Sequence, residues 1–147
     1  ICLLALVILS GCRPTPSPAP RPTPPPASPA PTISAEESWN AFLDDARTRC
    51  KPEEGCTIDF EKLHEYDGRH FGIMIIGYKD SEYYTNLYRF DAENNGWIDS
   101  PRSAPEDGYE HIDVPATSER WSVPEATIRG WITEAETTVR EIYSKRR

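Results

Sequence analysis

A proline-rich stretch divides the chain and restricts folding to the residues beyond it. Residues 13–32 hold ten of the 15 prolines and no aromatic, acidic or large aliphatic side chain. Such a segment cannot bury enough apolar surface to fold, and it favours extended polyproline II. At about 3.1 Å per residue it predicts a semi-rigid stalk of up to about 60 Å. A proline-rich ligand for an aromatic groove is the alternative use of such a segment.

An apolar run, residues 1–12 (ICLLALVILSGC), precedes the stalk. Eleven or so helical residues span only about 16 Å, half of a bilayer core, so the run favours a signal h-region over a spanning helix. An ordinary buried helix or strand is the alternative. Residue 1 is Ile and the run carries no basic n-region, so we expect the sequence to begin inside the signal.

The run closes with Leu9, Ser10, Gly11 and Cys12: a branched apolar residue, two small residues and a cysteine. This ending resembles the lipobox of bacterial lipoprotein precursors, and the resemblance covers this segment alone. It implies cleavage before Cys12, diacylation of the Cys12 thiol and, in many bacteria, acylation of the new amino terminus. Residues 1–11 are then a cleaved signal, and residues 12–32 are a lipidated cysteine followed by the stalk.

Several acyl chains, each stabilised by about 0.8 kcal/mol per buried methylene, would hold the protein on a membrane. The expected location is therefore extracytoplasmic, anchored by lipid to the cell membrane or the outer membrane. Arg13 follows the cysteine where Asp commonly signals retention in the inner membrane of Gram-negative lipoproteins. In an envelope with two membranes this favours the outer one.

The remaining residues, 33–147, have the size of a single domain. They carry all 24 acidic side chains and 14 of the 16 basic ones, a net charge of −10. Such a charge argues against binding to nucleic acid, which depends on neutralising phosphates, and against binding anionic lipid headgroups. We expect the lipid anchor alone to hold the domain on the membrane.

The number and positions of the cysteines are consistent with an exported protein. Cys2 would leave with the signal and Cys12 would carry lipid, so Cys50 and Cys56 remain as a pair. Outside the cytoplasm the default for such a pair is a disulfide, and closing this short loop would contribute about 2 kcal/mol. A metal pair or a redox site is the alternative, but CxxC spacing and a second ligand pair are missing.

Two amphipathic helices are predicted at the ends of the domain. Ser34 and Glu37 form a capping box, and apolar residues then recur at helical spacing up to Cys50. A second capping box with proline in the first turn, residues 122–125, opens a helix that runs to the C-terminus.

Strands are predicted between these helices. Residues 56–66, 69–78, 83–91 and 97–99 read as strands separated by turns, and residues 100–121 read as a loop with one further strand at 109–114. This order predicts an α+β two-layer sandwich, with an antiparallel sheet of three to five strands flanked by an N-terminal and a C-terminal helix.

The turns predict which side chains share a face. The turn at Asp67 and Gly68 places Phe60 opposite Ile75, and a turn at residues 80 and 81 places Ile75 opposite Asn86. The first face then forms the core, with Ile58, Phe60, Phe71, Ile73, Ile75, Tyr84, Tyr88 and Phe90. The second face carries Met74, Ile76, Tyr78, Tyr83 and Leu87.

If both helices cover the first face, those last five side chains stay exposed and form a surface for a protein or glycan partner. This is the favoured prediction. If a helix or the 100–121 loop covers them, the fold has three layers and this surface does not exist.

A possible calcium loop follows the third strand. Asp91, Glu93, Asn95 and Asp99 fall at ligand positions of an EF-hand-type loop, but its twelfth position is Arg102 instead of a bidentate carboxylate. An Asn-Gly hairpin turn explains the same residues, so we predict a turn and no metal or cofactor.

No catalytic residues are predicted. The sequence contains no G-x-S-x-G, H-E-x-x-H or glycine-rich phosphate loop, and its three histidines lack the spacing of a metal-binding helix. The favoured hypothesis is a non-enzymatic, lipid-anchored protein of the bacterial cell envelope, whose stalked domain binds another envelope component. The alternative is a small surface-tethered hydrolase or other enzyme.

Overall fold

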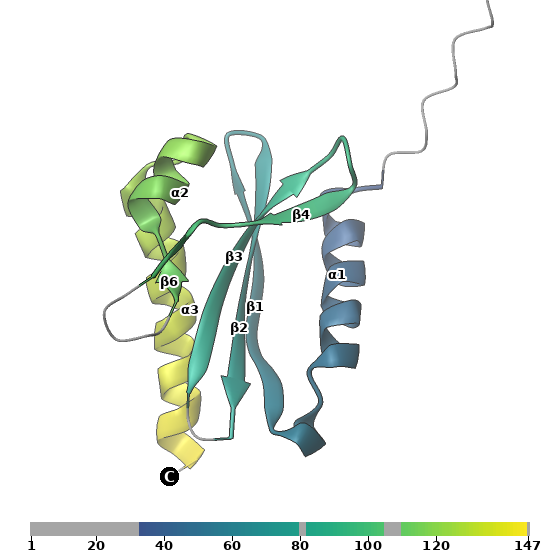
Figure 1. The fold of residues 1–147 in the computed structure, drawn as a ribbon, viewed down its shortest axis with the longest axis vertical. Helices are drawn as coiled ribbons and strands as arrows, with labels where there is room; N and C mark the ends of the chain where they lie inside the picture. Colours follow the sequence, from purple (N-terminus) through teal and green to yellow (C-terminus); the bar gives the residue numbers. More distant parts are fainter. Residues whose placement is uncertain (1–32, 80–81, 105–109, 147) are drawn as a thin grey trace, which may run out of the picture.

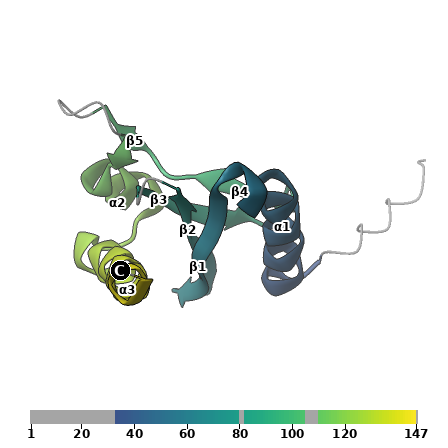
Figure 2. The same ribbon diagram turned by 90° about the horizontal axis from the view of Figure 1, so that it is seen from below.

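The computed structural model describes residues 33–79, 82–104 and 110–146. The predicted signal, Cys12 and the predicted stalk lie outside these residues. The described part is α+β, with a four-stranded antiparallel sheet in the order β1-β2-β3-β4. Helices lie on both sides of this sheet, as Figures 1 and 2 show. The predicted class, the antiparallel sheet and its two flanking helices are confirmed.

The main sheet contains β1 (Cys56–Tyr66), β2 (Arg69–Tyr78), β3 (Tyr83–Asp91) and β4 (Gly96–Asp99). A separate pair is formed by β5 (Arg102–Ser103) and β6 (His111–Ile112). The helices are α1 (Ala35–Arg49), the short 3-10 helix η1 (Pro52–Glu54), α2 (Val114–Trp121) and α3 (Glu125–Arg146).

The first helix begins as its sequence predicts. The Ser34 hydroxyl accepts a hydrogen bond from the Glu37 N–H at 3.1 Å, and the Glu37 carboxylate accepts one from the Ser34 N–H at 3.0 Å. These bonds satisfy two of the donors that a helix N-terminus leaves without partners. The bond from the Ser34 N–H, together with one that the Ser34 hydroxyl donates at 3.0 Å, lowers the pKa of the Glu37 carboxyl because both favour its charged form.

The second predicted capping box is wrong. Ser122 has a left-handed backbone (φ 50°) and closes α2, whereas α3 begins after Pro124, whose carbonyl accepts from two N–H groups further along the chain. Helix α2 itself lies in the stretch that the sequence predicts to be a loop. Asp113 caps it by accepting a hydrogen bond from the Ala116 N–H, and Pro115 lies in its first turn. An Asp at the N-cap and a proline in the first turn are typical of a helix start.

The hairpin between β1 and β2 has the predicted register. Phe60 lies opposite Ile75, and both Asp67 (φ 51°) and Gly68 (φ 67°) have the left-handed backbone of a two-residue hairpin turn. Beyond Phe60 the register shifts, so that Ile58 pairs with Ile76. Ile58 and Phe60 therefore lie on opposite faces, not on the same face as predicted.

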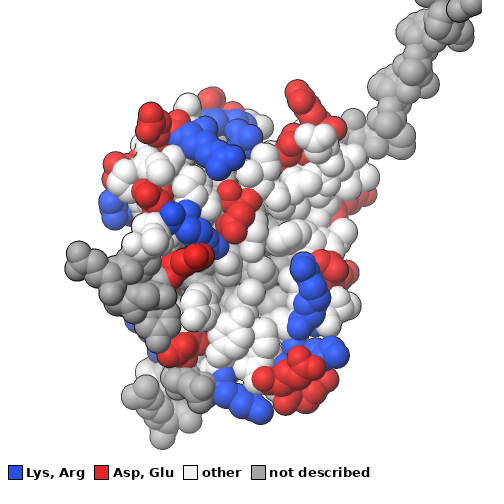
Figure 3. All heavy atoms as spheres, viewed as in Figure 1, with Lys and Arg blue, Asp and Glu red and all other residues white. Residues whose placement is uncertain are grey.

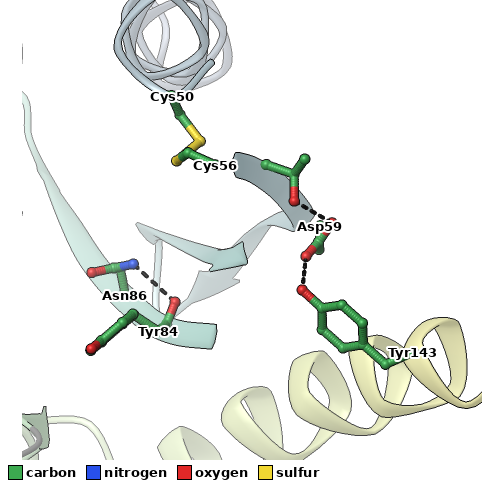
Figure 4. The surroundings of a disulfide bond; sticks show 7 residues. Cys50, Cys56, Asp59, Tyr84, Asn86 and Tyr143 are labelled. Atoms are coloured by element: carbon green, nitrogen blue, oxygen red, sulfur yellow. Dashed lines mark hydrogen bonds between the residues drawn. A yellow bond between two sulfur atoms is a disulfide. The ribbon is translucent and has the colours of Figure 1, made fainter. Parts of the chain in front are cut away.

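The extra residue in this bulge is Asp59. Its carboxylate accepts hydrogen bonds from the Tyr143 hydroxyl of α3 at 2.5 Å and from the Thr57 hydroxyl at 3.0 Å (Figure 4). A Cβ atom at Gly77 would overlap both Asp59 and Tyr143. The glycine therefore makes room for the bond that ties α3 to the first strand.

The register between β2 and β3 differs by one residue from the prediction. Ile75 lies opposite Thr85, not Asn86. The Tyr78 N–H donates to the Glu82 carbonyl at 2.8 Å, so residues 78 and 82 are paired. Three residues lie between them, whereas the predicted turn has two. A shift of one residue moves every side chain of a strand to the other face.

The two faces of the sheet are covered by different helices. Helix α3 packs on the face that carries Phe71, Ile73, Ile75 and Leu87, together with α2. Helix α1 packs on the opposite face, where its buried residues Trp39, Leu43 and Ala46 contact Met74. The molecule therefore has three layers where the sequence predicts two (Figure 2).

The predicted disulfide is confirmed. Cys50, directly after α1, is bonded to Cys56, the first residue of β1, and their Cα atoms are 5.1 Å apart. Figure 4 shows this bond joining the helix to the sheet. It fixes the C-terminal end of α1 above β1.

Candidate functional site

The five residues predicted to form a partner surface do not share a face. Met74, Ile76 and Tyr78 point towards the α1 side, and Tyr83 and Leu87 point towards the α3 side. Met74 and Leu87 are buried, at 2% and 0% exposure. The prediction that these five are exposed is therefore wrong, because the shifted register and the position of α1 place most of them in the cores. Tyr78 remains exposed, at 44%.

The residues of the possible calcium loop form a hairpin turn. Asp91 accepts hydrogen bonds from the Asn94 side chain and the Glu93 N–H, and these bonds lower the pKa of its carboxyl. Asn95 has a left-handed backbone (φ 48°), and Asp99 lies in β4 opposite Tyr88. Within the described residues, no group of three or more His, Cys, Asp or Glu side chains is placed to hold a metal ion.

The structure reveals a surface that sequence reasoning missed, the part of the β3 edge that extends beyond β4 and has β6 close beside it. This strand has nine residues and β4 only four, so β4 pairs with residues 88–91 alone. Beyond that point the Ser100 N–H donates to the Leu87 carbonyl at 2.9 Å, and Arg102 Nη1 donates to the Thr85 carbonyl at 3.0 Å. The backbone groups of residues 83, 85 and 87 therefore point away from β2.

We call the outward-pointing backbone groups of Tyr83 and Thr85 the free edge. Among the described residues, no strand pairs with these residues on the side away from β2. In that part of the chain, no hydrogen bond reaches the N–H groups of Tyr83 and Thr85 or the carbonyl of Tyr83. Backbone groups of this kind are strong hydrogen-bonding partners.

A hollow of about 690 Å³ lies on the α3 side of the free edge. One wall is a stripe of α3 at helical spacing, comprising Arg129, Ile132, Thr133, Glu136 and Arg140, which extends over about 16 Å. The opposite wall is formed by the start of β3, by His111 and Ile112 of β6, and by Val114. The size is that of a site for a small ligand or a few peptide side chains.

A second hollow of about 520 Å³ lies on the α1 side of the same edge. Its lining combines aromatic, apolar and polar residues, namely Ile76, Tyr78, Tyr84, Asn86, Asp99, Arg102 and Glu110. The rings of Tyr78 and Tyr84 meet edge to face, with centroids 5.5 Å apart and planes at 88°. This is a favoured aromatic geometry, and Tyr78, at 44% exposure, is the exposed member of the pair.

The oblique course of α1 explains why this second hollow is open. Near its N-terminus, Trp39 contacts Gly72 of β2 and lies 4.8 Å from the ring of Trp97 in β4. Its C-terminal end is tied to Cys56 of β1. The helix therefore crosses from β4 towards β1 and does not extend over Tyr84 of β3.

Polar networks hold the walls of both hollows. On the α1 side, Arg102 Nη2 donates to Asn86 at 2.8 Å and to Asp99 at 3.2 Å. On the α3 side, Arg140 donates to the Tyr83 hydroxyl and to Glu136, at 3.2 Å and 3.1 Å. The bond to Tyr83 raises the pKa of Arg140 further above its ordinary value.

The face of the molecule that bears this edge has a distinctive charge pattern. Figures 1 and 2 show that β3 and β4 lie towards the viewer of Figure 1, with β1 behind them. In the same view, Figure 3 shows acidic and basic side chains around a central region without charge. An uncharged centre with a charged rim is typical of a recognition surface.

One signal in the sequence could have located this surface. The fourth predicted strand ends before Pro101, after only a few residues, whereas the third continues for nine. A long strand beside a short one leaves part of its edge without a partner. The two hollows give no such signal, because they depend on how α1 and α3 lie across the sheet.

Comparisons with protein-family models, with curated proteins and with solved structures found no match to this chain. In the part of the chain that the structure describes, no helix has the length and apolar character to cross a membrane.

Proposed function

We propose that this protein is a lipid-anchored protein of the bacterial cell envelope, and that its stalked domain binds another envelope component without catalysing a reaction. The lipobox-like ending at Cys12 and the proline-rich residues 13–32 support the anchor and the stalk. The Cys50–Cys56 disulfide agrees with an oxidising compartment outside the cytoplasm.

The observation that carries the binding proposal is the free edge with a hollow on each side. It combines open backbone groups, the aromatic pair Tyr78 and Tyr84, and a rim of charged side chains. Aromatic residues at the centre and polar residues at the rim are the composition of protein recognition sites. The networks around Arg102 and Arg140 hold this surface in place, which reduces the entropic cost of binding.

The enzyme alternative has one observation in its favour. His111 lines the larger hollow together with Glu82, Glu110 and Glu136, and histidine with carboxylates is a common acid–base combination. We prefer binding because Glu136 is held by the Thr85 hydroxyl at 3.2 Å and by Arg140 at 3.1 Å. Those bonds hold the carboxylate in the wall of the hollow, as expected for a structural role.

The anchor is tested by growing cells with labelled palmitate. We expect label on the wild-type protein and none on the Cys12→Ser variant, which should also leave the membrane fraction. Label that persists in the Cys12→Ser variant would contradict lipidation at this residue.

The binding surface is tested by photo-crosslinking in intact cells. A photoreactive residue at position 78, whose side chain is 44% exposed, should give a discrete adduct with an envelope component. The matched control is position 40, an exposed position of α1. Adducts that are absent at both positions, or identical at both, would refute a partner site beside the free edge.

A further inference from the structure

We propose that Arg89, Ser100 and Trp121 form a binding site for a carboxylate group at the end of the sheet that α2 covers. This inference goes beyond the partner surface proposed above and does not depend on it, because Arg89 lies near the other end of β3. Three observations carry it: hydrogen-bond donors without partners, their position on one face of the sheet, and an arginine that no carboxylate pairs with.

The donors are the first observation. The Nε atom of Arg89, the hydroxyl of Ser100 and the indole nitrogen of Trp121 are buried and form no hydrogen bond with any described residue. Ser100 and Trp121 are only 4% and 1% exposed. Buried polar groups in native proteins nearly always have a partner, and a group without one costs free energy. The two nitrogens can only donate and the hydroxyl can donate, so the matching ligand is one that only accepts, such as an ionised carboxylate.

The three donors lie close together on the α2 side of the sheet. The Ser100 N–H donates to the Leu87 carbonyl at 2.9 Å, which places Ser100 opposite Leu87 and makes it the diagonal neighbour of Arg89. Diagonal neighbours on one face are about 7–8 Å apart, within reach of a long side chain. On its other side Arg89 is opposite Phe71, whose ring packs against Trp121 with centroids 5.7 Å apart. Arg89 is therefore a neighbour of both other donors.

Arg89 is also unusual among the arginines of this acidic domain. No ion pair or hydrogen bond joins it to a described residue. Asp91 follows on the same face of β3, but its carboxylate accepts from the Asn94 side chain and the Glu93 N–H. Five other arginines each form an ion pair with a carboxylate, namely Arg47, Arg49, Arg102, Arg129 and Arg140. A carboxylate from outside the domain would complete the same pairing at Arg89.

The surroundings favour an anion with a single charge. Arg69 adds a positive charge, because its guanidinium lies 5.8 Å from the centre of the Phe71 ring and donates to the carbonyls of Trp121 and Ser122. Figure 3 shows basic side chains gathered beside α2 near the top of the molecule. The whole domain carries −10, however, which repels a dianion such as phosphate more than a carboxylate. The carboxylate belongs either to a small molecule or to the end of a polypeptide.

The test follows the indole N–H signals of the four tryptophans by nuclear magnetic resonance. Sodium acetate is added at constant ionic strength to the full chain in a non-ionic detergent, and Trp121→Phe identifies the Trp121 signal. We expect this signal to move downfield and to saturate, because its N–H gains an acceptor. The Trp97 signal is the internal control and should stay in place, because Trp97 Nε1 already donates to the Ser38 hydroxyl at 3.1 Å.

Variants of the arginine provide the second arm. Arg89→Gln removes the charge and should weaken acetate binding at least tenfold. Arg129→Gln is the matched control, because Arg129 lies on α3 and is already paired with Glu125, and it should change the affinity less than twofold. Unfolding midpoints establish that both variants are folded. Should Arg89→Gln not fold, Arg89→Lys decides, because it keeps the charge but loses the fork that holds two oxygens, and it should weaken binding at least threefold.

N-acetylglycine separates the two sources of the carboxylate, because it ends as a polypeptide does. Binding at least tenfold tighter than that of acetate supports a chain end, and equal binding supports a small molecule. Inorganic phosphate that binds more tightly than acetate would overturn the choice of a carboxylate. If acetate moves no indole signal or moves all four alike, or if Arg89→Gln and Arg129→Gln have equal effects, the site at Arg89 is overturned. Crosslinking at position 78 still decides the proposed function independently.

Discussion

Replacing Gly72 with alanine tests whether α1 covers the second face of the sheet. Trp39 is 4% exposed and lies directly over this glycine, so that a Cβ atom at position 72 would be 2.5 Å from Trp39 Cη2 and closer still to Cζ3. Overpacking of this kind costs about 1–3 kcal/mol. Without a helix on this face, the same change in a strand would stabilise the protein by about 0.5–1 kcal/mol. The two arrangements therefore predict opposite signs.

The assay is equilibrium unfolding in guanidinium chloride with the disulfide intact. A double-mutant cycle with Trp39→Leu isolates the contact, because removing the indole ring makes room for the new methyl group. We expect the cost of Gly72→Ala to fall by at least about 1 kcal/mol in the Trp39→Leu background. Gly130→Ala is the matched control: no atom lies within 4 Å of its added Cβ, and in a helix the change should stabilise by about 0.5–1 kcal/mol. A stabilising Gly72→Ala, or an additive cycle, would refute the three-layer packing.

Three further predictions concern the core, the disulfide and pH. Leu87→Ala should cost about 2–5 kcal/mol in chemical unfolding because the side chain is fully buried, whereas Tyr78→Ala, at an exposed site with one ring contact to Tyr84, should cost no more than about 1.5 kcal/mol. Replacing both Cys50 and Cys56 with alanine should cost about 2 kcal/mol, and thiol titration of the folded domain without reductant should detect neither cysteine. Burial lowers the pKa of His64 below its ordinary 6.5, so the folded state resists protonation and stability should fall as the pH drops below 6.5. His64→Gln should reduce this loss between pH 7.5 and pH 5.5, and an unchanged pH dependence would contradict it.

Features that depend on neighbouring residues could be predicted from the sequence. The capping box at Ser34, the turn at Asp67 and Gly68, and the Cys50–Cys56 bond each involve residues close together in the chain. Their geometry is set by local sterics and local hydrogen bonds, which residue types and spacing specify directly. The α+β class depends on the same local signals, because the order of helices and strands restricts how they can form layers.

The candidate site depended on tertiary structure at three points. The bulge at Asp59 is held by Tyr143, 84 positions further along the chain. The connection after Tyr78 differs by one residue from the predicted turn, and this moves Leu87 to the opposite face. Both faces of the sheet are apolar, so hydrophobic pattern does not tell which one α1 covers. The packing of Trp39 on Gly72 contributes to that choice, because Gly72 has no side chain and leaves room for the indole ring.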